Sequence, residues 1–366
     1  MSGVPPGDVR AHDAGPAGPL SEPRRVRQKI ESNLEGLFLK EVVAAPCADG
    51  ARLAMVRKRL ADGRAPRGAV LLLHGITQNR YCWHLTRRSF ANFLAFGGYD
   101  VYNADLRGVG RSRALGAPFP TAVEQHVELD LPALVEAVRR QSGEERIFVV
   151  GFSLGGALAY AAAPRIEGAL RGLVTFAGAY QLGRGLPALR QASRLCLELD
   201  RRFGPAPRGA PSPAPLVGWL FHQYARFFNG PLNLLPLAAW EPGAMEGDLV
   251  LEWAKRAFDK TSYGVTFDVM RWAAEKRFTD STGAVDYAER WRSAAVPVLV
   301  LAGSHDRLNA PRGVKAAYDE ARSPDRTYRT LGPEDGGKAW GHVDLILGRR
   351  APTYVWPMVL DWLGGR

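Results

Sequence analysis

The sequence predicts an α/β fold in which a mostly parallel central sheet is flanked by helices and interrupted by an inserted helical cap. Short runs of aliphatic and β-branched residues, bounded by turn residues, alternate with longer segments of helical periodicity. This alternation is typical of a parallel sheet with helices on both faces. The expected strands are 69–73, 99–104, 146–150, 170–176, 296–301 and 326–331, and the expected helices between them include 122–140 and 153–163.

The N-terminal region divides into a tail and a hairpin. Residues 1–34 are expected to form a flexible tail, because the first 25 are rich in Gly, Pro and Asp and contain no long apolar run. Segments 37–44 and 52–60, joined through Asp49 and Gly50, predict an antiparallel hairpin that leads into the sheet. The first part of the core is therefore expected over 35–180.

The alternation of expected strands and helices is interrupted between residues 181 and 292. A loop rich in Pro, Gly, Ala and Ser over 204–215 is followed by apolar helical segments around 216–228, 249–258 and 267–278. A structureless loop of this length is improbable inside a compact domain. Residues 181–292 are therefore expected to form a helical cap or lid, and 293–366 to complete the core.

Composition excludes several classes of protein. The chain of 366 residues carries a formal charge of +11, but its basic residues are scattered in short doublets, so nucleic-acid binding is not expected. The three cysteines have no CxxC spacing, which argues against a disulfide framework and a zinc site. No apolar stretch is long enough to span a membrane, although transient contact with lipid is compatible with the sequence. A cytoplasmic location is the expectation.

The strongest chemical signal is the G-x-S-x-G sequence formed by residues 151–155. It follows the expected strand 146–150 directly and opens an Ala-rich helix, which is the strand-turn-helix setting of a nucleophile elbow. Ser153 is then the nucleophile. Glycine is expected at positions 151 and 155, where Gly151 and Gly155 stand, because a side chain at either position would collide with the neighbouring strand or helix.

A serine hydroxyl needs a base to take its proton and a carboxylate to orient that base. Asp306 comes just past the end of the expected strand 296–301, and His342 follows 36 residues later, after the strand 326–331. The order Ser, acid, His is the one that this kind of elbow uses. We therefore predict a catalytic triad of Ser153, Asp306 and His342.

Other histidines and one other acid are alternative candidates for the same roles. His305 is adjacent to Asp306, which makes simultaneous contact with Asp306 and Ser153 awkward. His222 lies in an apolar cap segment and is expected to be a core or pocket-wall residue. Asp344 is only two residues from His342 and is more simply explained as a cap for the next segment. His12, His84 and His126 have no matching position.

The developing oxyanion needs two backbone N–H donors. One should come from Leu154, the residue after the nucleophile, and the other from the loop after the strand 69–73. Gly75 would let the backbone approach the substrate there, and Ile76 is the expected donor. His74 is expected to order this loop rather than to titrate in catalysis.

These motifs together resemble a known family. The segments that carry the resemblance are Leu72-Leu73-His74-Gly75, 89–95, 98–102, Arg107-Gly108, 130–133, 151–155 and 341–344. They look like the α/β-hydrolase superfamily, most of all its acid-lipase-like branch, whose members hydrolyse esters of fatty acids. The resemblance covers roughly residues 38–363 except for the cap. It implies triad roles for Ser153, Asp306 and His342 and oxyanion roles for Ile76 and Leu154.

Two departures from that branch are visible. The composition of the first 25 residues does not predict a secretory signal, and Phe152 stands where the branch usually has a histidine before the nucleophile. A digestive or lysosomal type of role is therefore not expected. Dehalogenase-like and epoxide-hydrolase-like members of the superfamily are disfavoured, since they use aspartate where this chain has Ser153.

The expected function is hydrolysis of carboxylic esters through an acyl-enzyme, a chemistry that requires no metal or organic cofactor. The substrate would be a small acyl ester or thioester. An apolar acyl chain is expected because aromatic and aliphatic residues crowd the cap at 219, 221, 224, 227, 228, 232, 234, 235 and 240. Alternatives with the same triad are a thioesterase and an acyltransferase, and a non-catalytic binding protein is a third. The oligomeric state is left open.

Overall fold

The central feature of the computed structural model is a sheet of ten strands formed within the described residues 18–213, 219, 223, 239–336 and 338–366. Nine strands follow the spatial order β1-β3-β4-β8-β5-β9-β10-β11-β12, and β2 pairs with β3. Their bounds are β1 Gly18–Pro19, β2 Arg24–Glu31, β3 Leu34–Pro46, β4 Arg52–Leu60, β5 Ala69–Leu73, β8 Asp100–Asp105, β9 Ile147–Phe152, β10 Leu170–Phe176, β11 Val298–Gly303 and β12 Arg326–Leu331.

Pairing is antiparallel at one end of the sheet and parallel over the rest. Strands β1 to β4 and the junction of β4 with β8 are antiparallel, whereas β8, β5, β9, β10, β11 and β12 pair in parallel. The predicted fold class is therefore confirmed. Since the parallel strands run in one direction, the carboxyl ends of β5, β9 and β11 meet at the same edge, where open α/β sheets bind ligands.

The N-terminal tail is shorter than the sequence predicts. The sequence predicts a flexible tail over residues 1–34, but β1 and β2 are strands of the sheet and pair with β3. In β2, Val26 and Ile30 pack toward the core with Phe38 from β3. This alternation has the period of a strand, but it begins only where the Gly- and Pro-rich composition ends. The prediction was therefore wrong for residues 18–34, and residues 1–17 are outside the described part of the chain.

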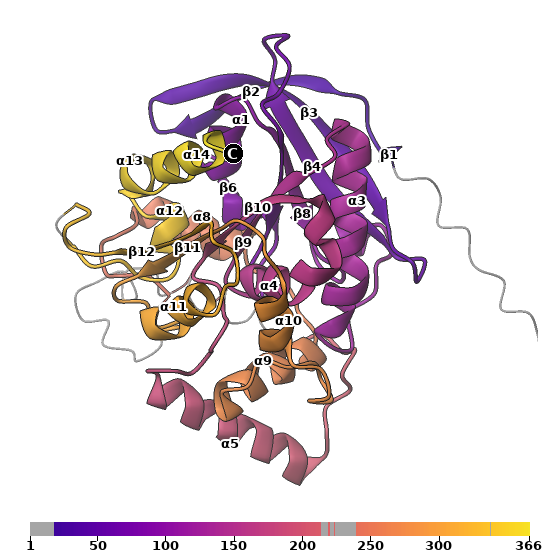
Figure 1. Cartoon of the computed structure of the whole chain (residues 1–366), viewed down its shortest axis with the longest axis vertical. Coiled ribbons are helices and arrows are strands. Elements are labelled where there is room, and N and C mark those ends of the chain that lie inside the picture. Colours follow the sequence, from indigo (N-terminus) through magenta and orange to yellow (C-terminus); the bar gives the residue numbers. More distant parts are fainter. Residues whose placement is uncertain (1–17, 214–218, 220–222, 224–238, 337) are drawn as a thin grey trace, which may run out of the picture.

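Helices cover both faces of the sheet (Figure 1). One apolar core contains residues of α3 Leu131–Ser142, α4 Leu154–Ile166, α9 Tyr263–Glu275, α10 Tyr287–Ser293 and α11 Pro311–Asp319. The other contains residues of α1 Phe90–Phe96, α8 Gly247–Arg256, α12 Asp344–Leu347, α13 Ala351–Tyr354 and α14 Trp356–Gly364. The remaining short elements are η1 Arg80–Trp83, β6 His84–Leu85, β7 Arg88–Ser89, α2 Gly110–Ala114, η2 His126–Asp130 and η3 Glu167–Ala169.

The chain between β10 and β11 carries helices joined by loops in its described parts. It contains α5 Pro187–Phe203 and α8, α9 and α10. Helices α5 and α9 pack together at the lower end of the molecule in Figure 1, far from β2 and β3. Helix α10 instead packs on α4, with Trp291 against Tyr160 at a ring-centroid distance of 4.8 Å. The helix expected over 216–228 lies outside the described residues apart from residues 219 and 223.

Candidate active site

Ser153 lies at a sharp turn between β9 and α4. Its backbone has φ 54° and ψ −113°, a conformation that is strained for a residue with a side chain. An added Cβ at Gly151 would lie 2.6 Å from the backbone of Gly155, and one at Gly155 would lie 2.5 Å from the carbonyl oxygen of Leu73. Glycine is therefore required at both positions by close backbone contact, as expected for a nucleophile elbow.

Asp306 and His342 form a buried hydrogen-bonded pair. The Nδ1–H of His342 donates to Oδ2 of Asp306 at 2.6 Å. The other carboxylate oxygen, Oδ1, accepts from the backbone N–H groups of Leu308 and Asn309, both at 2.8 Å. The Asn309 side chain in turn donates to the carbonyl of Ala177 at 2.6 Å, after β10. This arrangement fixes the imidazole with Nδ1 as a donor and leaves Nε2 as an acceptor.

Ser153 and His342 line the same cavity, which has a volume of about 310 Å³. The imidazole of His342 packs on the ring of Phe152 at a centroid distance of 4.7 Å. Asp306 lies behind His342 and does not line the cavity. The structure thus brings all three predicted triad residues to one place, with the nucleophile and the base on the wall of one cavity.

The loop after β5 forms another part of the cavity wall. Gly75 and Ile76 line the cavity together with Leu154 at the first turn of α4. An added Cβ at Gly75 would lie 3.3 Å from Cβ of Ser153, so this backbone passes close to the nucleophile. The positions of both predicted oxyanion donors are therefore adjacent to Ser153, and the N-terminus of α4 favours negative charge there.

His74 holds the same loop in place. Its Nε2 accepts from the backbone N–H of Leu106 at 3.1 Å, and its Nδ1–H donates to the carbonyl of Gly75 at 2.8 Å. Burial lowers the pKa of His74, which keeps the ring neutral. Both ring nitrogens are occupied, so His74 has the ordering role that the sequence predicts.

The rest of the cavity wall is mostly apolar. Residues of the segment between β10 and β11 contribute much of this wall. The sequence predicts that this segment borders the site, but it does not predict which of its residues line the cavity. Among the aromatic residues that the sequence singled out, Trp219 is exposed and Trp240 is buried, while the others are outside the described residues. Besides the predicted triad and oxyanion residues and Gly75, the residues that line the cavity are Thr77, Gln78, Phe152, Ala179, Leu182, Leu189, Ala239, Trp253, Phe258, Val269, Leu308, Asn309 and Val343.

The competing histidines have other partners. His305 is half exposed, and its Nδ1 lies 2.7 Å from the carboxylate of Glu241. His126 forms a second buried His–Asp pair, with Asp130 at 2.6 Å, but Nε of Arg107 also donates to Asp130 at 2.7 Å. None of these residues lines the cavity that contains Ser153. His222 is outside the described residues.

Asp344, the competing acid, stabilises the turn that carries His342. Its Oδ2 accepts from the backbone N–H groups of Gly341 at 2.7 Å and Glu241 at 2.9 Å. Its other oxygen, Oδ1, is buried without a hydrogen-bond partner among the described residues. Burial raises the pKa of Asp344 to about 7, so the carboxyl is largely protonated in mildly acidic solution.

The raised pKa of Asp344 predicts a pH-dependent stability. The folded protein holds this proton up to a pH of about 7, whereas the unfolded chain releases it near pH 3.8. The contribution of protonated Asp344 to the free energy of unfolding is therefore fully present below about pH 4 and is lost as the pH rises through about 7. Asp344→Asn keeps an acceptor but does not titrate. We expect the melting temperature of the wild type to fall relative to Asp344→Asn between pH 4 and 8, by the equivalent of a few kcal/mol. A difference that does not change with pH would contradict this reading.

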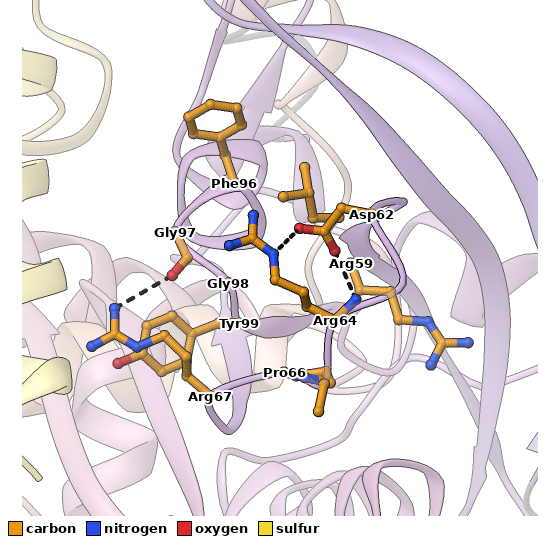
Figure 2. A pocket seen from close by; sticks show the side chains of 11 residues that line it. Arg59, Asp62, Arg64, Pro66, Arg67, Phe96, Gly97, Gly98 and Tyr99 are labelled. Atoms are coloured by element: carbon orange, nitrogen blue, oxygen red, sulfur yellow. Dashed lines mark hydrogen bonds and ion pairs between the residues drawn. The ribbon is translucent and has the colours of Figure 1, made fainter.

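A second cavity of similar size does not carry this chemistry. It has a volume of about 320 Å³, and Figure 2 shows the residues that line it. These residues precede the amino ends of β5 and β8, whereas Ser153 follows the carboxyl end of β9. Arg59, Arg64 and Arg67 line it, with Asp62 and the exposed ring of Phe96. No serine, cysteine or histidine is among its lining residues. Size alone therefore does not distinguish the two cavities, whereas position does: only the cavity that contains Ser153 lies at the carboxyl ends of the parallel strands.

Three further observations concern metals, membranes and thiols. Within the described ranges, no group of three or more His, Cys, Asp or Glu residues could hold a metal ion. No helix in the same ranges is long and apolar enough to cross a membrane. Cys47 and Cys82 are buried free thiols, and Cys196 is an exposed one. The cytoplasmic location stays a prediction.

Comparison with known proteins gives a consistent picture. A family model described as alpha/beta hydrolase fold matches residues 68–338. Human lipase member M is 25% identical over 328 residues, which is 78% of this chain and 72% of that protein. Mouse lipase member K is 34% identical over 107 residues, and the match spans only 27% of each chain.

A solved structure extends the similarity to the fold. A soluble variant of monoglyceride lipase from Saccharomyces cerevisiae superposes with a TM-score of 0.56 at 16% identity, covering 94% of this chain and 98% of that one. At this level of identity the likeness concerns the arrangement of helices and strands alone.

Proposed function

Because the chain belongs to the alpha/beta hydrolase fold family, we propose that it is a serine hydrolase that cleaves carboxylic esters with an apolar acyl chain. The observation that carries this proposal is the geometry at one cavity. His342 is oriented by Asp306 at 2.6 Å and shares the cavity wall with Ser153 at a strained elbow. The lipases among the relatives support ester hydrolysis as the reaction class.

Acylation begins at Ser153. Nε2 of His342 takes the Oγ proton as Oγ attacks the ester carbonyl, and Asp306 stabilises the imidazolium that forms. The tetrahedral oxyanion accepts hydrogen bonds from the backbone N–H groups of Ile76 and Leu154. Its collapse breaks the bond to the leaving oxygen, which receives the proton from His342 and departs as the alcohol.

Deacylation repeats these steps with water. His342 takes a proton from a water molecule, which attacks the acyl-Ser153 carbonyl and forms a second oxyanion in the same site. Collapse releases the carboxylic acid and returns the proton to Oγ. The carboxylate of Asp306 holds the imidazole in both half-reactions, and the backbone N–H groups of Leu308 and Asn309 donate to its other oxygen and fix its orientation.

The cavity supports the preference for an apolar acyl group. Leu182, Leu189, Val269, Trp253 and Phe258 contribute apolar surface from the segment between β10 and β11. Each buried methylene contributes about 0.8 kcal/mol, so binding should improve with chain length until the cavity is filled. A thioester would present the same carbonyl and acyl chain, and an acyltransferase would replace water by an alcohol or amine.

The proposal is tested with p-nitrophenyl esters from acetyl to palmitoyl. We expect kcat/KM to rise from the acetyl ester to a medium-chain ester by at least about tenfold and then to level off or fall. Repeating the series with thioesters of the same acyl groups shows whether oxygen or sulfur is the preferred leaving atom. Adding an alcohol to the ester assays shows whether the acyl group passes to water or to the alcohol. If the protein hydrolysed none of these esters, the proposal would be wrong. If kcat/KM stayed constant or fell with increasing chain length, the proposed apolar acyl pocket would be wrong.

A further inference from the structure

A third cavity, separate from the one that contains Ser153, has an unusual charge. It has a volume of about 110 Å³ and lies among β2, β3, β4, β8, η1, β6, α1, α2 and α8. Five basic residues line it and neither Asp nor Glu does. Its other lining residues are Gln28, Val56, Tyr81, His84, Ala91, Val101 and Asn103, and it shares no lining residue with the ester cavity.

Three of the five cations have no carboxylate partner among the described residues. Arg80 pairs with Asp105 at 2.6 Å, and Arg256 pairs with Glu252 at 2.8 Å. The ammonium of Lys58 instead donates to the side-chain oxygen of Asn92 at 2.7 Å. Lys40 and Arg111 also line the cavity, and no ion pair of either is found within the described ranges. An excess of uncompensated positive charge therefore faces one small space.

The positive charge around this cavity affects the pKa of Lys58. Its side chain is 3% exposed, and burial, together with Lys40 and Arg80, lowers its pKa well below the ordinary value. Burial and Lys58 likewise lower the pKa of His84, whose ring lies within 3.5 Å of the Lys58 ammonium. A protein normally pairs a buried cation with an anion. A bound anion would supply that missing partner.

Two polar acceptors in the same wall lack partners as well. The side-chain oxygens of Asn103 and Gln28 are buried and accept no hydrogen bond from the described residues. Asn103 is 4% exposed, and its amide nitrogen donates to the carbonyl of Arg80, which orients the side chain. A ligand for this site should therefore carry negative charge and at least one hydrogen-bond donor.

We propose that this cavity is a binding site for inorganic phosphate. Hydrogen phosphate carries two negative charges at neutral pH and keeps one hydroxyl, so its oxygens can accept from Lys58, Arg80 and Arg111 while its hydroxyl donates to an amide oxygen. Sulfate has the same shape and charge but no hydroxyl at that pH. The volume suits a small ion, since one water needs only about 10–15 Å³ of such space.

The arginine-lined cavity of Figure 2 is a weaker candidate for the same ion. Arg64 pairs there with Asp62 at 2.6 Å, and Arg67 lies over the ring of Tyr99 and within 3.5 Å of the carbonyl of Gly97 (Figure 2). An acid lines that cavity, and Arg64 is 81% exposed. Arg64→Gln therefore provides a control that removes the same charge from a different cavity.

The test is calorimetric titration of the full-length protein with inorganic phosphate at low ionic strength. We expect saturable binding of one phosphate per chain, and binding of sulfate and methyl phosphate that is weaker by about tenfold or more. Lys58→Met keeps the aliphatic stem of the side chain and should weaken phosphate binding by at least about tenfold. Arg111 is exposed, so Arg111→Gln should fold normally; it should also weaken phosphate binding, whereas Arg64→Gln should not change it.

Three results with phosphate itself, and one with the competing ions, would overturn the proposal. They are absence of saturable binding, equal affinity of the wild type and both site variants, and a loss of affinity in Arg64→Gln equal to that in Arg111→Gln. Tighter binding of sulfate or methyl phosphate than of phosphate would reject the ion assigned here. The ester-hydrolysis rates of Arg111→Gln should equal those of the wild type, so failure of the phosphate site is distinguishable from failure of the esterase proposal.

Discussion

Ser153→Ala should lower kcat for the best p-nitrophenyl ester by about 10³–10⁶-fold, because the variant has no atom that can form the acyl-enzyme. The melting temperature should change little, since Ser153 is only partly buried and its side chain makes no hydrogen bond within the described residues. The measurement is steady-state hydrolysis, with the uncatalysed rate subtracted.

The same logic predicts strong non-additivity. His342→Gln alone should cost about as much as Ser153→Ala, and the double variant should cost little more than either, because nucleophile and base act as one unit. His305→Gln is the matched control, since His305 pairs with Glu241 and does not line the cavity. Wild-type activity in Ser153→Ala, or a comparable loss in His305→Gln, would contradict the assignment.

Asp306→Asn should reduce kcat by about 10⁴-fold without a matching loss of stability. The amide oxygen of the new side chain can still accept from the N–H groups of Leu308 and Asn309, so the loop should hold. Its NH₂ group would then face Nδ1 of His342 and act as a donor. The imidazole would have to accept at Nδ1 and carry its proton on Nε2, which is the wrong tautomer for a general base.

Asp344→Asn provides the control for this variant. Asp344 is an equally buried carboxyl only two residues from His342, but it accepts from Gly341 and Glu241 and does not contact the imidazole. Its replacement should change the pH dependence of stability and leave kcat within about tenfold of the wild type. If Asp344→Asn were the more damaging variant, the acid of the triad would have been assigned to the wrong residue.

Much of the parallel part of the fold could be predicted from sequence, because buried parallel strands are continuous aliphatic runs. Residues 69–73, 170–176 and 326–331 coincide with β5, β10 and β12. The strand β2 was missed because its alternating pattern has mostly charged residues on the exposed face. Helix α5 was missed for a related reason, since its exposed positions include many arginines and few of its residues are buried.

The candidate site was predictable where chain order and backbone geometry define it. The elbow needs glycines at 151 and 155, and the acid and base must follow in order, so the sequence alone predicts all three candidate triad positions that line or back one cavity. Asn309 was not predicted, although a donor three residues after an aspartate is a signal of an Asx turn. The cavity-wall residues from the segment between β10 and β11, and the charged cavity that η1 helps to line, depend on packing between distant segments, which no local sequence pattern predicts.

The central claim is that Ser153 is the nucleophile, and the most direct measurement is covalent labelling with a fluorophosphonate, followed by mass spectrometry of the digested protein. The account predicts one adduct per chain, on the peptide that contains Ser153. Labelling should slow by at least about 10³-fold in His342→Gln and stay at the wild-type rate in His305→Gln. An adduct on another residue, or ester hydrolysis that persists after Ser153 is fully labelled, would contradict the account.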